Sequence, residues 1–139
     1  MQGARYRVRD AGWILGNKVM SGYKELEIYQ IAFDLAIKVH HASLKLPAFE
    51  LYEQGSQIRR SSKRIKDTIA EGYGRKKYKA DFIKYLTYAQ ASCDEVTAQL
   101  NMISDTHFTE QPLTELMNDY GILGRKMNKF IQYVEKEWK

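Results

Sequence analysis

The chain has 139 residues, a net charge of +5, 44% hydrophobic residues, two prolines and a single cysteine. This length suits one domain around one core, and the composition is typical of a soluble globular protein. The single cysteine excludes an intramolecular disulfide, and Cys and His nowhere share the spacing of a zinc site. We therefore expect a cytoplasmic protein without metal or cofactor. No apolar run approaches the ~18 residues of a membrane helix, so we expect no membrane association.

Residues 1–19 show neither a helical nor a strand period, and they contain three glycines. We expect them to form a mobile N-terminal arm, or an upstream extension if translation starts at Met20. Four basic residues and one acidic residue lie in this arm, so the predicted domain over residues 20–139 carries less net charge than the whole chain. The position of the charges is therefore more informative than their total.

Four segments carry apolar residues at steps of three and four, which is typical of amphipathic helices. These segments are 25–46, 51–72, 82–103 and 113–138. Pro47 is expected to end the first helix, a left-handed glycine at Gly72 or Gly74 to cap the second, and Thr109 to cap the start of the fourth. Because short connections make neighbours antiparallel, the sequence predicts an all-α fold, an antiparallel up-down four-helix bundle.

The first predicted helix has more apolar surface than one bundle core requires. Ile31, Phe33 and Ile37 lie beyond its core stripe. Exposed apolar surface of this size is usually covered by a partner. We therefore expect a homo-oligomer.

Three motifs follow one another along the second and third predicted helices. They are QIRR at residues 57–60, IAEG at residues 69–72 and ASCDEVTAQL at residues 91–100. In order and spacing they resemble the 23S rRNA intervening-sequence protein family, also called the four-helix bundle protein family, over about residues 23–138. The resemblance implies a bacterial bundle, commonly a pentamer, without established enzymatic activity. A related bundle, the accessory variability determinant of diversity-generating retroelements, implies nucleic acid and a reverse transcriptase as partners.

The chain departs from this family pattern before the IAEG motif. The family usually has Ser-Ile-Pro-x-Asn there, whereas residues 64–68 read Arg-Ile-Lys-Asp-Thr. Lys66 in place of the proline predicts a straighter helix and adds a charge. Gln54 stands where a leucine is common, so the start of the second helix is expected to differ.

Basic residues concentrate between residues 59 and 79, where nine of them accompany only two acidic residues. Steps of four and three place some of them on one helix face, and others follow in the next loop. Such a surface suits the phosphate backbone of RNA or DNA. In the alternative interpretation it is a solvated surface whose cations oppose the dipole at the helix C-terminus. The candidate nucleic-acid-binding residues are Arg59, Lys63, Lys66, Arg75, Lys76, Lys77 and Lys79.

A second group of mixed sign lies on the adjacent face and on the third predicted helix. We expect it to make ion pairs within or between subunits, with Arg59 or Arg60 reaching Asp94 or Glu95. The group consists of Arg60, Arg64, Asp67, Glu71 and Glu95.

Aromatic and acidic residues near the basic loop allow further interpretations. Tyr73 and Tyr78 flank the loop and are candidates for stacking on unpaired bases, whereas Tyr85 is expected in the core. Glu71 with Glu95 could suggest paired catalytic carboxylates, but no nucleophile, general acid or metal-ligand motif accompanies them. We therefore assign no catalytic residue and expect no enzyme.

Together these patterns favour a non-catalytic, oligomeric helical bundle that binds the backbone of RNA or DNA as an adaptor. The alternative is a structural scaffold for a protein partner such as a reverse transcriptase, with the basic residues serving solubility.

Overall fold

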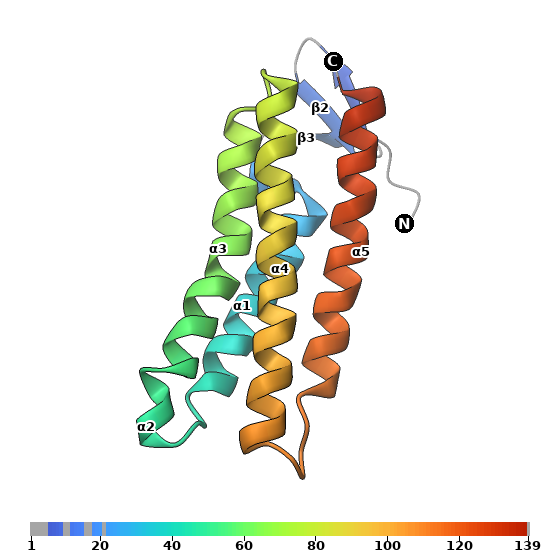
Figure 1. Cartoon of the computed structure of the whole chain (residues 1–139). Helices are drawn as coiled ribbons and strands as arrows, with labels where there is room; N and C mark the ends of the chain where they lie inside the picture. Colours follow the sequence, from blue (N-terminus) through green and yellow to red (C-terminus); the bar gives the residue numbers. More distant parts are fainter. Residues whose placement is uncertain (1–5, 10–11, 16–17, 21, 139) are drawn as a thin grey trace.

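Four long helices lie side by side and run alternately up and down (Figure 1). The computed structural model describes residues 6–9, 12–15, 18–20 and 22–138. α1 packs against α3 and α5, and α4 packs against the same two helices. The prediction of an all-α four-helix bundle is thus confirmed. The elements are η1 (Tyr23–Glu25, a 3-10 turn), α1 (Glu27–Ser43), α2 (Ala48–Leu51), α3 (Gln54–Gly74), α4 (Lys79–His107) and α5 (Thr114–Glu137).

The backbone ahead of the bundle forms three short antiparallel strands, β1 (Tyr6–Arg9), β2 (Gly12–Leu15) and β3 (Lys18–Met20). The sequence-based expectation of no strand here was wrong. Runs of three or four residues are too short to display a clear alternation. The positions between the strands and residues 1–5 lie outside the described residues. The mobility of an arm over residues 1–19 and a start at Met20 therefore stay predictions.

One apolar stripe from each long helix lines the core. Ile69 of α3 and Leu100 of α4 are buried, as the spacing predicted. α4 differs from the prediction at one position, because Leu86 is fully buried whereas Tyr85 lies half-buried at the surface. Both residues satisfy a step of three or four from the buried Phe82. Packing between helices, not the period, decides which of them enters the core.

Three predicted helix boundaries were wrong. α1 ends at Ser43, four residues before Pro47. After Ser43 the backbone N–H groups of residues 44–46 donate to carbonyl oxygens three residues earlier, as in a 3-10 turn. The second predicted helix is split into α2 and α3. The residue preceding α5 is Leu113, so Thr109 is not its N-cap. Instead, the Leu113 N–H donates to Ser104 Oγ at 3.2 Å.

Gly72 serves close helix packing and does not cap α3. Neither Gly72 nor Gly74 has a positive φ, and α3 continues to Gly74 with Arg75 as its C-cap. The predicted left-handed glycine cap was therefore wrong. A Cβ at residue 72 would lie 2.8 Å from the Cβ of Tyr85 on α4. The absence of a side chain lets α3 and α4 approach each other at this point.

We predict that Gly72→Ala destabilises the fold by about 1–3 kcal/mol, since the added methyl meets a Cβ that cannot swing aside. Gly74→Ala is the matched control because nothing lies within 4 Å of a Cβ there. Alanine is the better helix former by about 1 kcal/mol, so the control should be neutral or slightly more stable. Urea unfolding measures both. Equal free energies of unfolding for the two variants would contradict the packing role.

Candidate nucleic-acid interface

The turn between α3 and α4 gathers four of the seven candidate nucleic-acid-binding residues. A hydrogen bond from the Tyr78 N–H to the carbonyl oxygen of Arg75, at 2.9 Å, holds its backbone. The turn lies at the same end of the bundle as the C-terminal end of α5 (Figure 1). The four residues are Arg75, Lys76, Lys77 and Lys79.

Arg75 is held by acidic and aromatic neighbours. Its guanidinium lies 4.0 Å from the carboxylate of Glu71 and 3.6 Å from that of Asp81. Its Cζ also lies 4.8 Å from the centroid of the Tyr85 ring. These groups are largely exposed, so the ion pairs contribute little to stability. They orient Arg75 along the surface beside the turn, and they give Glu71 a partner that had been assigned to the nucleic-acid-binding group.

Two hydrogen bonds fasten the turn to the end of α5. Lys79 Nζ donates to the carbonyl oxygen of Glu135 at 2.6 Å, and Trp138 Nε1 donates to that of Lys76 at 2.9 Å. The Trp138 ring packs edge-on against Phe82, with centroids 4.8 Å apart. The turn therefore has a fixed backbone although it is a surface connection.

Lys76 and Lys77 each lie near a tyrosine ring. Lys76 Nζ is 4.3 Å from the centroid of Tyr73, and Lys77 Nζ is 5.8 Å from that of Tyr78. Tyr73 is buried, and this burial, with the negative charge of Glu25 nearby, raises its pKa. Tyr78 is 62% exposed. Of the two tyrosines proposed for stacking, only Tyr78 is accessible to a base.

Arg59 has a structural task inside the subunit. Its Nη1 donates to Ser43 Oγ at 2.8 Å, and its Nη2 donates to the carbonyl oxygen of Leu51 at 2.7 Å. These bonds join α3 to the end of α1 and to α2. Charge-assisted hydrogen bonds to partly buried groups hold an arginine more firmly than exposed ion pairs do. We therefore leave Arg59 out of the interface that we propose below.

Lys63 and Lys66 lie apart from the turn, beside α1. Both border a groove between α1 and α3 whose other wall includes Phe33 and Ile37. Lys66 Nζ pairs with the neighbouring Asp67 and lies 5.9 Å from the centroid of the Phe33 ring. The basic residues that are close in sequence are thus divided between a turn and a groove.

Four of the five residues of mixed sign make ion pairs among the described residues, with partners that differ from those predicted. Arg64, not Arg59 or Arg60, approaches Glu95, at 3.6 Å. Arg60 donates to Ser56 Oγ at 2.6 Å. The contact of Gly72 with Tyr85 fixes the antiparallel register of α3 and α4. Arg64 precedes Gly72 by about two turns on α3, so it lies opposite the part of α4 about two turns after Tyr85, within one turn of Glu95.

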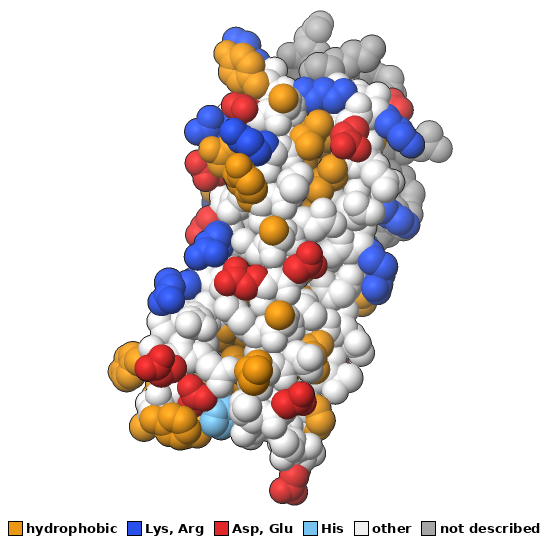
Figure 2. All heavy atoms as spheres, in the orientation of Figure 1, with side chains coloured by type: hydrophobic (Ala, Val, Ile, Leu, Met, Phe, Trp, Pro, Cys, Tyr) orange, Lys and Arg blue, Asp and Glu red, His pale blue; other side chains and the backbone are white. Residues whose placement is uncertain are grey.

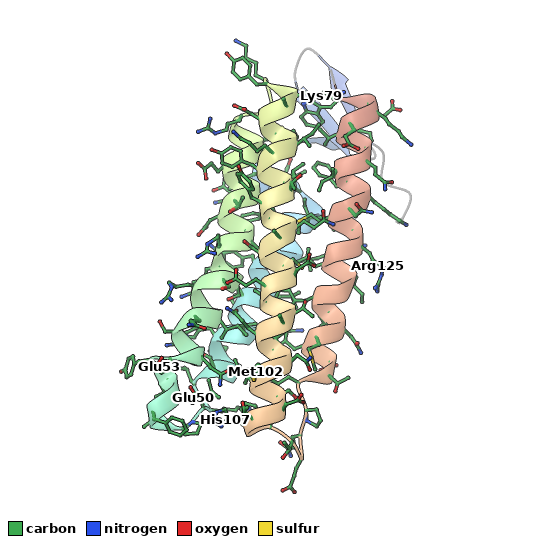
Figure 3. All side chains as sticks on the ribbon, in the orientation of Figure 1. Glu50, Glu53, Lys79, Met102, His107 and Arg125 are labelled. Carbon is green, nitrogen blue, oxygen red and sulfur yellow. The ribbon has the colours of Figure 1, made fainter. Side chains whose placement is uncertain are left out.

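A hydrogen bond between α4 and α2 that the sequence did not predict closes the other end of the bundle. His107 Nε2 donates to Glu50 Oε2 at 2.7 Å, and Gln54 Nε2 donates to the same oxygen at 2.6 Å (Figure 3). These two bonds lower the pKa of Glu50, the bond from His107 having the larger effect. In the sequence, only the unusual Gln54 indicated that this region differs. Glu50 and His107 lie too far apart along the chain for a spacing rule to connect them.

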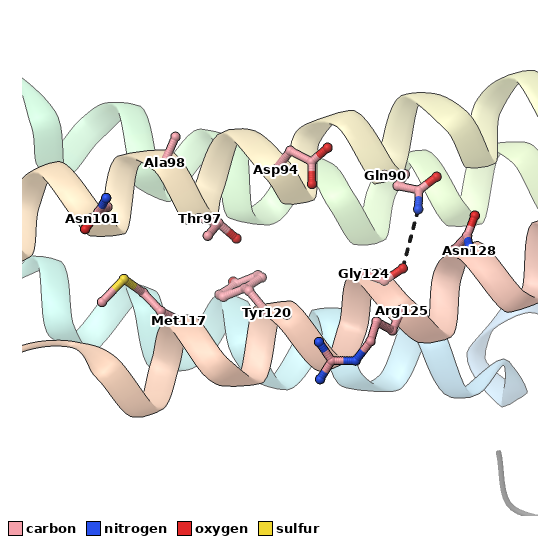
Figure 4. A pocket seen from close by; sticks show the side chains of 11 residues that line it. Gln90, Asp94, Thr97, Ala98, Asn101, Met117, Tyr120, Gly124, Arg125 and Asn128 are labelled. Atoms are coloured by element: carbon pink, nitrogen blue, oxygen red, sulfur yellow. Dashed lines mark hydrogen bonds between the residues drawn. The ribbon is translucent and has the colours of Figure 1, made fainter.

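A hollow of about 740 Å³ lies between α4 and α5 (Figure 4). Amide side chains and glycines line it, and Gln90 Nε2 donates across it to the carbonyl oxygen of Gly124 at 3.4 Å. At the base of this region Cys93 is buried, and burial raises the pKa of its thiol to about 12. A protonated, buried thiol is a poor nucleophile.

In the described ranges, no three His, Cys, Asp or Glu side chains come together as a set that could hold a metal ion. Nor does any described helix combine the length and the apolar character of a membrane span.

The chain was compared with known protein families. A family model described as 23S rRNA-intervening sequence protein matches residues 24–129, a stretch that starts in η1 and extends into α5. No curated protein matches the chain.

Because its folded pKa lies below the ordinary 4.5, ionised Glu50 should stabilise the folded chain. This stability is present above pH 4.5 and is lost as the pH falls through the lowered pKa. Glu50→Gln should therefore unfold at lower urea than the parent at about pH 5.5, and the difference should shrink towards about pH 3. Glu53→Gln, at the exposed neighbour, is the control. A difference for Glu50→Gln that is independent of pH would contradict the role of the carboxylate.

Proposed function

The chain belongs to the 23S rRNA-intervening sequence protein family, and we propose that it acts as a non-catalytic adaptor that binds the nucleic-acid backbone through its α3–α4 turn. The family name alone does not establish a ligand. The proposal depends on the charge and exposure of the turn itself.

The proposal rests mainly on two lysines of the turn, Lys76 and Lys77, whose ammonium groups are not paired with a carboxylate of any described residue. Within the part of the chain that the structure describes, Lys76 and Lys77 have no carboxylate partner. A lysine without an acidic neighbour attracts phosphate without first breaking an ion pair, and displaced counterions provide the driving force.

The distribution of charge over the surface agrees with this assignment. On the face in Figure 2, Lys and Arg side chains, with Asp and Glu side chains among them, lie over the half with the α3–α4 turn and over the middle of the bundle. The opposite end, around α2, shows acidic and hydrophobic side chains. A polyanion would therefore approach the turn and be repelled from the opposite end.

Tyr78 supports a preference for unpaired strands. Its exposed ring stands beside Lys77, and stacking on an unpaired base provides about 1–3 kcal/mol. Phosphate contacts carry no base information, so binding by this surface would not depend on sequence. We propose an adaptor for RNA or DNA single strands with little sequence preference.

We further propose that the adaptor is a homo-oligomer, a pentamer by resemblance, located in the cytoplasm. Phe33 and Ile37 are 42% and 46% exposed on α1. A ring of subunits would multiply a weak cationic patch into useful avidity. A reverse transcriptase as protein partner stays a prediction from the resemblance.

The first test replaces the uncommitted ammonium groups. Lys76→Glu with Lys77→Glu should weaken binding to single-stranded RNA and DNA of every sequence alike. The slope of log affinity against log salt should fall by about 0.7–0.9 for each lost contact. Salt-titrated fluorescence anisotropy measures both quantities.

Two controls accompany this test. Lys45→Glu with Lys129→Glu makes the same change of net charge at two exposed positions outside the turn and should leave the slope unchanged, while deletion of residues 1–19 removes the basic groups of that segment. Equal loss of affinity in both double variants would mean that total charge alone governs binding. No binding by the parent near 0.1 M salt would refute the adaptor.

The second test concerns assembly. Light scattering coupled to gel filtration should return a mass several times the 16.2 kDa of one chain. A mass of one chain across a hundredfold range of concentration would refute the oligomer.

A further inference from the structure

The groove between α1 and α3 combines apolar and cationic groups on an uncovered surface. Its volume is about 370 Å³, and Phe33, Ala36 and Ile37 supply apolar side chains from α1. Lys63 and Lys66 border it from α3. Single exposed apolar side chains are ordinary, but a contiguous apolar hollow with a polar rim marks an interaction surface.

The charge on this rim is available to a partner. Lys63 has no acidic partner among the described residues. Lys66 is paired with Asp67, but this pair is exposed on the acidic side and is worth little. A carboxylate that arrives from another molecule can therefore take either ammonium group at small cost. The occupant should be acidic at its edges and carry small or flexible apolar side chains at its centre.

The outer side of α4 has these properties. Steps of three and four align Ala91, Asp94, Glu95, Ala98, Met102 and Asp105, all of them exposed, and we call this surface the α4 ridge. Glu95 lies 3.6 Å from Arg64 of its own subunit, but both side chains are about half exposed, so this pair contributes little and Glu95 can exchange it for a new partner. Figure 2 shows acidic side chains in the middle of this face with small hydrophobic groups between them. Met102 is 59% exposed and projects from the lower part of α4 (Figure 3).

We propose that the α4 ridge of one copy docks into the α1–α3 groove of the next copy, with Asp94 and Glu95 facing Lys63 and Lys66. The alanines allow the helix backbone to come close, and Met102 is long and flexible enough to fill an irregular apolar hollow. This inference rests on the self-association proposed above and adds the two surfaces that meet.

The positions of groove and ridge determine the symmetry of the contact. α1 and α4 both pack against α3 and α5, so they occupy opposite corners of the bundle. The groove and the ridge are therefore different surfaces, and each copy offers one to each neighbour. Such a head-to-tail contact produces a ring when the rotation closes. Lys63 and Lys66 are then covered by a neighbouring subunit, which leaves the α3–α4 turn for nucleic acid.

Charge exchange tests the proposal on the full chain. The groove variant carries Lys63→Glu and Lys66→Glu, and the ridge variant carries Asp94→Lys and Glu95→Lys. Each should elute near 16.2 kDa by itself, because like charges then face each other. Mixing the two restores opposite charges at every contact, so the mixture should regain the mass of the parent assembly.

Matched controls separate assembly from folding and from net charge. Lys45→Glu with Lys129→Glu makes the same charge change as the groove variant at exposed positions outside the groove and should keep the parent mass. Ala98→Arg places a large side chain on the exposed ridge without reversing a charge pair, and it should also dissociate the assembly. Circular dichroism should show unchanged helix content and melting temperature within a few degrees for each dissociated variant.

The masses of the parent and of the two variants separate the docking contact from self-association as a whole. A parent that is itself a monomer refutes the self-association and this inference with it. A parent oligomer whose mass is unchanged in the groove or ridge variant refutes the docking contact alone, and the oligomer stands. Dissociation of both variants without recovery on mixing also refutes the pairing of these surfaces. A groove variant that keeps the parent mass but loses nucleic-acid binding would assign the groove to nucleic acid instead.

Discussion

The close contact of α3 with α4 at Gly72 is the constraint on which the geometry of the cationic end depends. Two helices can approach this closely only where one of them lacks a side chain, and the approach fixes how far each helix is turned about its axis. Leu86 is thereby directed into the core, and Tyr85 is left at the surface beneath the guanidinium of Arg75. The same contact places Arg64 opposite Glu95 about two helical turns away along α3.

The helices and most of the core could be predicted from the sequence because burial imposes a period on each helix by itself. The period could not distinguish Tyr85 from Leu86, since both satisfy it and only the neighbouring helix decides. Helix ends were also missed, because the N–H of Leu113 is satisfied by Ser104, nine residues earlier in the chain. No local rule includes such a partner. The strands of the N-terminal segment were missed since each is only three or four residues long.

The candidate site was predicted as one basic cluster, and the structure separates it into groups with different surroundings. Arg59 faces Ser43 and Leu51, Lys63 and Lys66 border an apolar groove, and Lys76 and Lys77 of the turn have no carboxylate partner among the described residues. The sequence shows how many basic residues lie close together along the chain, but not which groups surround each of them. What each charge can do depends on the groups that surround it, and those come from α1, α2, α4 and α5. The hydrogen bond between Glu50 and His107 was missed for the same reason, because its two residues lie on different helices.

Because α5 holds the α3–α4 turn in place, substitutions in α5 can affect the arrangement of the lysines in that turn. Trp138 and the backbone of Glu135 hold the turn through two hydrogen bonds, yet neither residue carries a positive charge. Substitutions in the last turn of α5 can therefore change the spacing of the lysines while the charge of the molecule stays constant. Trp138 also packs on Phe82 and is mostly buried, so in a chain that carries Trp13→Phe its indole fluorescence is an optical probe of this end of the bundle. The chain thus contains its own reporter of whether the lysines are held in their binding arrangement.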